Sequence, residues 1–508
     1  MNAPRPPLVT GLLRTLPGAR LIETHISWVI LADGYAYKLK KPLDLGFLDF
    51  SSLEKRRFCC EEEVRLNRRL APATYLGTVA ITGTPDAPGI GGDGPVLEWA
   101  VWMRAFPADA TLDHEPQVTE AQVDAIADRV ASFHQDIPCA PADSRYGEPE
   151  QVRAPIRENF LQIRALRPPA GLLARLDALE AWSQEEGERL VPHFRARKAA
   201  GGVRECHGDL HLGNIAWVEA APLIFDGIEF NPDLRYIDVT SEIGFLAMDL
   251  LHRGEDALAW RALNRYLEHT GDYAGLAALR YYMVYRAMVR AKVAAIRARQ
   301  ADADFAEALV YMELAARLSR PPSPALILMH GVSGSGKSVL AQALLQALGA
   351  IRLRSDVERK RLFGLRPLDG SHAIPGGIYG REAGERTLAR LLALTEALLR
   401  EGFRVIVDAT FLAREWRTPF QALAASLRLP WCLVSPQVPE TLLRERVRQR
   451  QAAGADASEA DLAVLEAQLA GQVPLDADEL RRALTPPANW ALAPLLTQLD
   501  ALLARPSP

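Results

Sequence analysis

The sequence predicts a two-domain protein that combines α+β and α/β architecture. Its 508 residues exceed what one hydrophobic core ordinarily covers. Strand patterns followed by helical patterns fill the chain up to residue 320, whereas strands and helices alternate from residue 325 onward. The first order is typical of an α+β fold, and the second is typical of a parallel sheet between two helical layers. The proline-rich segment 319–324 separates them, because proline cannot continue a helix. We therefore expect domains at 1–320 and 321–508.

The first domain is expected to divide into a small lobe, about 1–106, and a helical lobe, about 107–320. Alternating apolar residues predict its strands, and apolar residues at helical spacing predict its helices. The expected order is a helix at 7–16, strands at 20–25, 27–31 and 35–41, a helix at 53–70, and strands at 75–81 and 96–106. Segment 82–95 is rich in Gly, Pro and Asp and is expected to be a turn. Further helices are expected at 116–135, 155–196 and 255–318.

The second domain is expected to be a three-layer α/β/α fold with a parallel sheet. Short apolar runs bounded by turn signals are typical of buried parallel strands. They lie at 325–329, 403–407 and 431–435, and a further strand ends near Arg354. Helical patterns occupy 339–345, 382–401 and 444–450, and the tail 476–505 is expected to pack around Trp490.

A phosphate-binding loop is predicted where the first of these strands meets its helix. Segment 331–338 reads Gly-Val-Ser-Gly-Ser-Gly-Lys-Ser and fits G-x-x-x-x-G-K-[ST]. Glycines let backbone N–H groups turn toward phosphate oxygens, and the positive end of the helix attracts the same anion. We expect Lys337 to reach the terminal phosphates and Ser338 to ligate Mg²⁺. The residues expected to hold the nucleotide are Gly331, Ser333, Gly334, Ser335, Gly336, Lys337 and Ser338. The alternative is a glycine-rich turn without a chemical role.

Acidic residues follow two of the strands in this domain. Asp356 lies just beyond the second strand, at the edge of a parallel sheet where ligands bind. It is a candidate base for a hydroxyl group, and Arg359 is a candidate clamp for a phosphate of the acceptor. The alternative is an N-capping aspartate with a solvated arginine. Asp408 ends an apolar strand, as a Walker-B carboxylate does near Mg²⁺, and Thr410 and Arg417 are candidates for substrate contact.

The predicted helix 444–450 carries an arginine at every second position. Residues four apart share a helix face, so these arginines fall on two faces. We expect Arg446 and Arg450 to contact the nucleotide phosphates. An ordinary solvated face is the alternative.

The first domain contains a strand lysine followed by a helix glutamate, Lys38 and Glu63. Phosphoryl-transfer enzymes use such a pair to hold the α- and β-phosphates of ATP. The alternative is that both residues are ordinary solvated side chains.

The same domain supplies the other groups that phosphoryl transfer needs. Residues 207–214 contain H-x-D-x-x-x-x-N, and residues 224–230 add a further aspartate. Asp209 would align the acceptor hydroxyl and accept its proton, and Asn214 and Asp226 would hold Mg²⁺. A polar hairpin with a buried histidine is the alternative.

The motifs at 207–214 and 224–230, with the following segment 234–238, resemble the aminoglycoside-phosphotransferase and choline-kinase-like branch of the protein-kinase-like fold. The resemblance covers roughly 20–320 and implies a bilobal kinase-like domain with a catalytic Asp209. The sequence departs from the family's pattern in one place. Segment 24–27 is too short to form a glycine-rich loop over a triphosphate, which also leaves open a non-catalytic, ligand-binding pseudokinase.

The C-terminal motifs resemble P-loop kinases related to polynucleotide kinase, zeta toxins and chloramphenicol phosphotransferase, which are AAA-type ATP-binding proteins. The features are segment 331–338, Ser-Asp-x-x-Arg at 355–359, Val-Asp-Ala-Thr-Phe at 407–411, and the arginine helix followed by Ser458 and Asp461. The resemblance covers roughly 325–475. It implies transfer of the ATP γ-phosphate to a hydroxyl, beneath a lid that carries the arginines.

The sequence as a whole therefore predicts a bifunctional ATP-dependent phosphotransferase that uses ATP and Mg²⁺ and acts on an alcohol group. The acceptor is expected to be a small molecule or a nucleotide or oligonucleotide hydroxyl. The alternative is a P-loop kinase or ATPase regulated by a pseudokinase N-terminal domain, as a signalling or toxin-like switch. A third possibility is an ATPase that has no small acceptor.

The composition is that of a globular protein, with 49% hydrophobic and 24% charged residues. A formal net charge of -4 argues against a general nucleic-acid-binding surface and against binding to anionic membranes. The five cysteines form no C-x-x-C pair, which is typical of a reducing compartment. We expect a cytoplasmic protein without a membrane partner.

Overall fold

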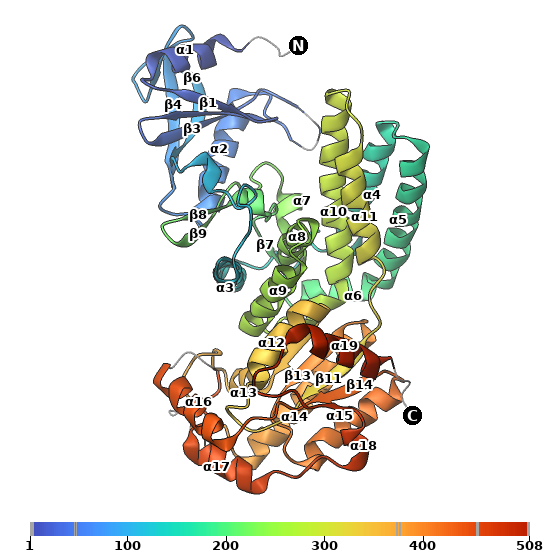
Figure 1. Cartoon of the computed structure of the whole chain (residues 1–508). Coiled ribbons are helices and arrows are strands. Elements are labelled where there is room, and N and C mark those ends of the chain that lie inside the picture. The colour runs from blue at the N-terminus through green and yellow to red at the C-terminus, as the bar shows by residue number, and fades with distance from the viewer. Residues whose placement is uncertain are drawn as a thin grey trace. The chain divides into compact units, whose positions relative to one another are not determined.

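The computed structural model describes residues 5–44, 46, 48–371, 374, 377–453 and 457–504 (Figure 1). The chain forms two compact units. The N-terminal unit comprises Met1–Ala165 and Gln184–Asp249, and the C-terminal unit comprises Leu166–Ser183 and Leu250–Pro508. These divisions differ from the predicted boundary between residues 320 and 321, because the helix at 256–270 precedes this boundary but packs against the C-terminal sheet.

The N-terminal unit contains a six-stranded antiparallel sheet with the strand order β1-β2-β3-β6-β4-β5. The strands are β1 (Arg20–Glu23), β2 (Ser27–Ala32), β3 (Tyr35–Lys40), β4 (Tyr75–Thr84), β5 (Ala87–Ile90) and β6 (Val96–Arg104), with helices α1 (Pro7–Thr15) and α2 (Leu53–Asn67). β5 lies inside the segment that the sequence predicts to be a turn. Its sequence, Ala-Pro-Gly-Ile, disfavours a strand, and the structure places it at the sheet edge, where proline is tolerated.

Helix α2 packs against β4 and β6 through one hydrophobic cluster. Cys60, Val64, Tyr75 and Val101 form its buried centre. The side chain of Ser52 caps the helix by accepting a hydrogen bond from the Lys55 N–H at 3.3 Å. This packing fixes the helix face that carries the predicted glutamate.

The rest of the N-terminal unit is helical, with two short antiparallel strand pairs. The helices are α3 (Glu120–Asp136), α4 (Pro149–Ala165), α6 (Val191–Ala199), α7 (Pro232–Arg235) and α8 (Val239–His252), and the strand pairs are β7 (Val203–Glu205) with β10 (Tyr236–Asp238) and β8 (Ile215–Val218) with β9 (Ala221–Ile224). Helix α5 (Ala170–Arg189) has residues in both units. The β8–β9 pair brings together the two predicted motifs, 207–214 and 224–230. The Phe225 N–H donates to the Asn214 carbonyl at 3.0 Å, at the end of the pair opposite its turn.

The C-terminal unit contains a five-stranded parallel sheet with the order β12-β13-β11-β14-β15. Its strands are β11 (Ala325–Met329), β12 (Ile351–Arg354), β13 (Arg404–Asp408), β14 (Trp431–Val434) and β15 (Ala483–Leu484). All residues of β11 are buried, as expected for a central strand covered on both faces. The fold class predicted for the two parts of the chain is confirmed.

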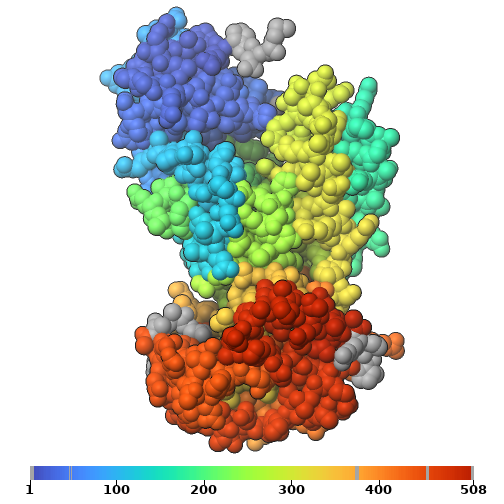
Figure 2. Space-filling model, viewed as in Figure 1, coloured from blue at the N-terminus to red at the C-terminus, as the bar shows by residue number. Residues whose placement is uncertain are grey.

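Helices cover both faces of this sheet (Figure 1). The helices described in the C-terminal unit are α9 (Asp256–Thr270), α10 (Leu276–Gln300), α11 (Ala306–Leu318), α12 (Lys337–Leu348), α13 (Ser355–Leu362), α14 (Arg381–Arg400), α15 (Arg414–Ser426), α16 (Glu440–Ala453), α17 (Leu462–Gly471), α18 (Ala477–Leu480) and α19 (Leu492–Leu503). Among them, α9, α12, α13, α14 and α19 pack against strands of the sheet. Helix α19, red in Figure 2, lies at the surface against α12 and β14. Among the helices of the described residues, none has the length and apolar character needed to cross a membrane.

Candidate active site

The predicted phosphate-binding loop connects the buried end of β11 to the first residue of α12. Gly331, Gly334 and Gly336 have φ values of 128°, 81° and 83°, a region that favours glycine. A Cβ atom on Gly334 would lie 2.8 Å from the Leu443 carbonyl oxygen. Glycine is therefore needed at this position both for its backbone conformation and for the space it leaves to α16.

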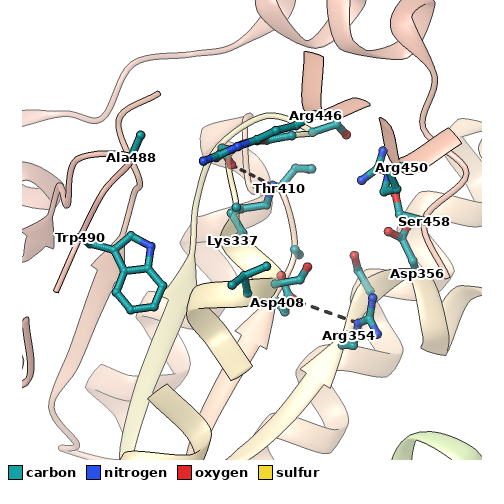
Figure 3. Close-up of a pocket in the computed structure, with 18 residues that line it drawn as sticks. Lys337, Arg354, Asp356, Asp408, Thr410, Arg446, Arg450, Ser458, Ala488 and Trp490 are labelled. Atoms are coloured by element: carbon teal, nitrogen blue, oxygen red, sulfur yellow. Dashed lines mark hydrogen bonds and ion pairs between the residues drawn. The ribbon is translucent and has the colours of Figure 1, made fainter. Parts of the chain in front are cut away.

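A cavity of about 530 Å³ opens at this loop (Figure 3). Its lining comprises Ser333, Gly334, Ser335, Gly336, Lys337, Ser338, Val339, Arg354, Ser355, Asp356, Asp408, Ala409, Thr410, Arg446, Arg450, Ser458, Ala488 and Trp490. In Figure 3, Lys337 lies between Trp490 on one side and Arg450 and Asp356 on the other. Every residue predicted for the nucleotide and metal of this half lines the cavity, with the exception of Gly331.

Burial sets the protonation of two basic residues next to the loop. Lys337 is buried, which lowers the pKa of its amine to about 8. Its Nζ donates to the Val332 carbonyl at 2.8 Å, inside the loop. Burial likewise lowers the pKa of His330 to about 4, with Arg417 as a second cause. His330 contacts the Ser435 hydroxyl through Nδ1 at 2.8 Å. This histidine is therefore neutral at pH 7 and packs beneath the phosphate-binding loop.

The Asp408 carboxylate fits a magnesium site. Its Oδ2 atom is buried and has no hydrogen-bond partner within the described part of the chain. The Nε atom of Arg354 lies 4.0 Å from this oxygen, at the limit of an ion pair. Asp408 and Ser338 line the same cavity. A carboxylate oxygen without a hydrogen-bond partner is the kind of oxygen ligand that Mg²⁺ prefers.

Asp356 lies in the first turn of α13 and pairs with Arg359 at 3.0 Å. The residue before α13 is Arg354, so Asp356 is not the N-cap that the alternative interpretation requires. Arg359 lies over the Tyr379 ring, 5.0 Å from its centroid. Asp356 and Arg359 both line a second cavity of about 860 Å³, which shares Ser355 and Thr410 with the first.

A third, smaller cavity of about 220 Å³ opens between α14 and α15. Ser355, Thr410 and Arg359 line it together with the apolar side chains of Leu388, Leu391, Phe411, Leu412 and Trp416. Phe411 has a φ of 48°, which is unusual for a bulky residue and is typical of functional sites.

The arginines of α16 lie on two faces of the helix, as the helix geometry predicts. Arg446 Nη1 donates to the Gly334 carbonyl at 3.5 Å, and Arg450 Nη2 donates to the Ala460 carbonyl at 2.7 Å. Arg444 instead pairs with Glu440 and Glu466. The structure therefore brings Arg446 and Arg450 to the cavity, where the sequence expects them.

The expected substrate contact of Arg417 is wrong. Its side chain is fully buried, pairs with Glu479 at 2.6 Å, and donates to the Phe411 carbonyl at 2.8 Å. Arg417 thus stabilises the strained backbone of Phe411 through this hydrogen bond. Thr410, by contrast, lines all three cavities.

The predicted lysine–glutamate pair forms in the N-terminal unit. Lys38 Nζ lies 2.9 Å from Glu63 Oε1 and also contacts the Asp226 carboxylate. Burial alone would lower the pKa of Lys38, but Asp226 and Glu63 raise it well above the ordinary value. The Lys38 ammonium in turn outweighs burial and lowers the pKa of Asp226. Both charges are therefore retained at neutral pH.

A second lysine, Lys40, joins this group although no sequence pattern predicted it. It is fully buried and contacts both Glu63 and Glu229. Lys40 lies two residues after Lys38 on β3, so both side chains point to the same face of the sheet. This spacing of two residues on a predicted strand could have placed Lys40 beside Lys38.

The buried carboxylate of Glu242 holds the predicted catalytic loop in place. Its carboxylate accepts hydrogen bonds from the N–H groups of His207 and Gly208 at 3.0 and 2.7 Å, and contacts His134 Nε2 at 3.0 Å. Although burial opposes the charge, these bonds lower the pKa of Glu242 to about 2. Within the loop, Asn214 Nδ2 donates to Asp209 Oδ2 at 3.0 Å.

The connection between β1 and β2 has the predicted shortness. Only residues 24–26 separate the two strands, and the Thr24 N–H closes the turn by donating to the Ser27 carbonyl at 3.0 Å. The N-terminal unit therefore combines the residues predicted for phosphoryl transfer with a turn that is too short to cover a triphosphate.

Comparison with known proteins places the chain in a family. The AAA domain family matches residues 326–475, which confirms the P-loop domain that the sequence predicts. Rv2004c of Mycobacterium tuberculosis, an uncharacterized protein, is 30% identical over 455 residues, covering 88% of this chain and 89% of that protein. The chain belongs to the Rv2004c family. Mb2027c of Mycobacterium bovis, another member, matches with the same identity and coverage.

Solved structures similar to this Rv2004c family member include a gluconokinase from Sinorhizobium meliloti, which is 22% identical with a TM-score of 0.26 and covers 36% of this chain and 93% of its own. An ethanolamine kinase from Plasmodium vivax is 11% identical with a TM-score of 0.38 and covers 62% of this chain and 85% of its own.

Trp490, Ala488 and Arg354 line the main cavity, although none of the three was expected to have a functional role. Trp490 packs against the core cluster beneath α19, as the sequence predicts, but it also lines the main cavity beside Ala488. Both lie more than a hundred residues after the phosphate-binding loop, and no spacing in the sequence relates them to it. Arg354 also lines the cavity, and its position at the carboxyl end of β12 was the signal that could have identified it.

Proposed function

We propose that the C-terminal half transfers the γ-phosphate of ATP to a hydroxyl group of an acceptor. The observation that carries this proposal is the cavity that joins Lys337, Asp408 and Asp356 at one edge of the parallel sheet. Lys337 and the N–H groups at the start of α12 would hold the triphosphate. Arg446 and Arg450 on α16 would contact its phosphates from the other side of the cavity.

In this proposal Asp356 accepts the proton of the acceptor hydroxyl. The hydroxyl oxygen then forms a bond to the γ-phosphorus, while the bond from that phosphorus to the β-phosphate oxygen breaks and ADP leaves. Ser338 and Asp408 would hold Mg²⁺, which neutralises charge on the phosphates when it is bound. Arg359 would orient Asp356 through their 3.0 Å contact.

The two further cavities, which continue from Ser355 and Thr410, are where the acceptor would lie. The larger one offers Arg359 and Asp356 to polar groups, and Arg359 would clamp an acceptor that carries a phosphate. The smaller one offers an apolar wall of Leu391 and Trp416. A small-molecule alcohol or a nucleotide or oligonucleotide end are therefore both acceptors to test.

We further propose that the N-terminal unit is a second phosphoryl-transfer site. Lys38 and Glu63 would hold the nucleotide, Asp209 would be the base, and Asn214 and Asp226 would hold Mg²⁺. The ion pair of Lys38 with Glu63 and the support of the Asp209 loop by Glu242 favour this role, because they fix the positions of the candidate nucleotide-binding lysine and of the candidate base.

A second candidate function rests on the tight turn at residues 24–26. Without a loop over the phosphates, the N-terminal unit would be a ligand-binding pseudokinase that regulates the C-terminal site. This alternative predicts ATP-dependent transfer from one site alone.

Labelled ATP tests both roles in the intact chain. Sugars, aminoglycosides, nucleosides and 5′-hydroxyl oligonucleotides are offered to the wild type, to Lys337→Ala and to Asp209→Ala. We expect Lys337→Ala to lose one transfer activity and Asp209→Ala to lose another, with unchanged circular dichroism. Full turnover by Lys337→Ala on every acceptor would refute the C-terminal assignment. If Lys337→Ala binds no ATP at millimolar concentration with Mg²⁺, the N-terminal unit is a regulatory module.

A further inference from the structure

Helix α9 precedes the predicted domain boundary but packs against β12 and α12 within the C-terminal unit (Figure 1). Asn264 bonds the backbone at the start of β12. Its Nδ2 donates to the Ala350 carbonyl at 2.9 Å, and its Oδ1 accepts from the Arg352 N–H at 2.7 Å. Trp260 lies so close to Gly349 that a Cβ there would be 2.8 Å from its Nε1. This helix is therefore a fixed part of the nucleotide-binding domain.

One turn further along α9, Glu268 is buried against two arginines of β12. Its Oε1 accepts hydrogen bonds from Arg352 Nε and Nη2 at 3.0 and 2.6 Å, and its Oε2 accepts one from Arg354 Nη1 at 3.4 Å. Arg352 also donates through Nη1 to the carbonyl of Ser338, in the first turn of α12. Burial opposes the charge of Glu268, but the two guanidinium groups outweigh it and lower its pKa.

Arg354 lies between Glu268 and the candidate metal carboxylate. It is hydrogen-bonded to Glu268 on one side. On the other side its Nε lies 4.0 Å from Asp408 Oδ2, at the limit of an ion pair, and Figure 3 marks this contact with a dashed line. That oxygen is buried and has no hydrogen-bond partner among the described residues. A guanidinium without Glu268 would move to the nearest buried carboxylate, because charge-assisted pairs are strong where water is excluded.

We propose that Glu268 is a positioning residue that holds Arg354 away from Asp408 and thereby leaves Asp408 available to Mg²⁺. This inference rests on the proposed function of the C-terminal site. It also means that the metal site depends on a helix that comes from the chain segment before the proline-rich linker.

Binding of Mn²⁺, followed by electron paramagnetic resonance at saturating ADP, tests the proposal in the full chain without relying on turnover. We expect Glu268→Gln to weaken Mn²⁺ binding by about 10- to 100-fold, the range typical for residues that orient metal ligands. The double variant Glu268→Gln/Arg354→Gln should regain most of the wild-type affinity, since the competing guanidinium is gone. Asp256→Asn is the matched control, because it removes an exposed carboxylate of the same helix that pairs with Arg317.

A merely structural role for Glu268 would lower the melting temperature but leave Mn²⁺ affinity unchanged, and that result would overturn the proposal. So would a double variant that binds Mn²⁺ no better than Glu268→Gln. If Glu268→Gln does not fold, Glu268→Asp keeps a charge opposite Arg352 while withdrawing the carboxylate from Arg354, and it should also weaken Mn²⁺ binding. Absence of ADP-dependent Mn²⁺ binding in the wild type would instead contradict the proposed function itself.

Discussion

The buried amine of Lys337 should make nucleotide binding depend on pH. Its pKa of about 8 means that roughly half of the free protein lacks this charge at pH 8. A bound triphosphate would raise this pKa, because an adjacent anion favours the charged form. Binding should therefore take up about half a proton at pH 8 and nearly one proton at pH 9.

The magnitude follows from the lowered pKa. Bringing it from about 8 back to its ordinary value of 10.5 corresponds to about 3 kcal/mol of interaction between the phosphates and the ammonium. As the pH rises above 8, the dissociation constant of ATP should increase by up to about tenfold per pH unit. Below pH 7 the amine is charged in both states, and Lys337 contributes no pH dependence.

Isothermal titration calorimetry in buffers of different ionisation enthalpy measures the proton uptake directly. Lys337→Arg is the control, because its guanidinium stays charged over this whole range. It should bind ATP without the proton uptake seen in the wild type. Equal uptake by both proteins at pH 8.5, or none by the wild type, would refute the assignment of this pKa to a phosphate-binding lysine.

Three further variants or conditions test the surroundings of the loop. Gly334→Ala should cost about 1–3 kcal/mol in unfolding free energy and weaken ATP binding, because its positive φ and the Leu443 carbonyl exclude a Cβ; unchanged denaturant midpoints would argue against this. Arg417→Met should cost about 3–5 kcal/mol, since it leaves Glu479 buried and unpaired, and replacing both residues by apolar ones should cost less in the same urea titration. The pKa of His330 in the folded protein, about 4, lies below its value in the unfolded chain, so the unfolded chain binds more protons between pH 4 and 6.5. On acidification across this window the free energy of unfolding should therefore fall by up to about 3 kcal/mol. His330→Gln should reduce this pH dependence.

The sequence predicts those parts of the fold and site whose determinants are local. The strand, glycine loop and helix around Lys337 are contiguous, so their pattern identifies both the structure and its place at the sheet edge. The same holds for Asp408, because a strand that ends in an acidic residue places it at that edge. The edge strand β5 escaped prediction because its Pro and Gly residues resemble a turn, and only pairing with β4 makes it a strand.

Residues that act through distant contacts carry no such local signal. Trp490, Glu242 and Glu268 reach their sites only through tertiary packing, and each lies on a helix or loop whose sequence is explained by core packing alone. Arg417 shows the opposite error. An arginine shortly after a Walker-B-type strand resembles a substrate contact, but its burial against Glu479 is determined by a segment sixty residues further along the chain.

The central claim is that the loop before α12 holds the triphosphate of ATP with Mg²⁺ between Ser338 and Asp408. A crystal structure of the full chain with a non-hydrolysable ATP analogue and Mg²⁺ tests it most directly. We expect the β- and γ-phosphates against the N–H groups of residues 334–338, with the Lys337 amine turned from the Val332 carbonyl to the phosphates. A nucleotide bound only in the N-terminal unit, with Lys337 still bonded to Val332, would contradict it.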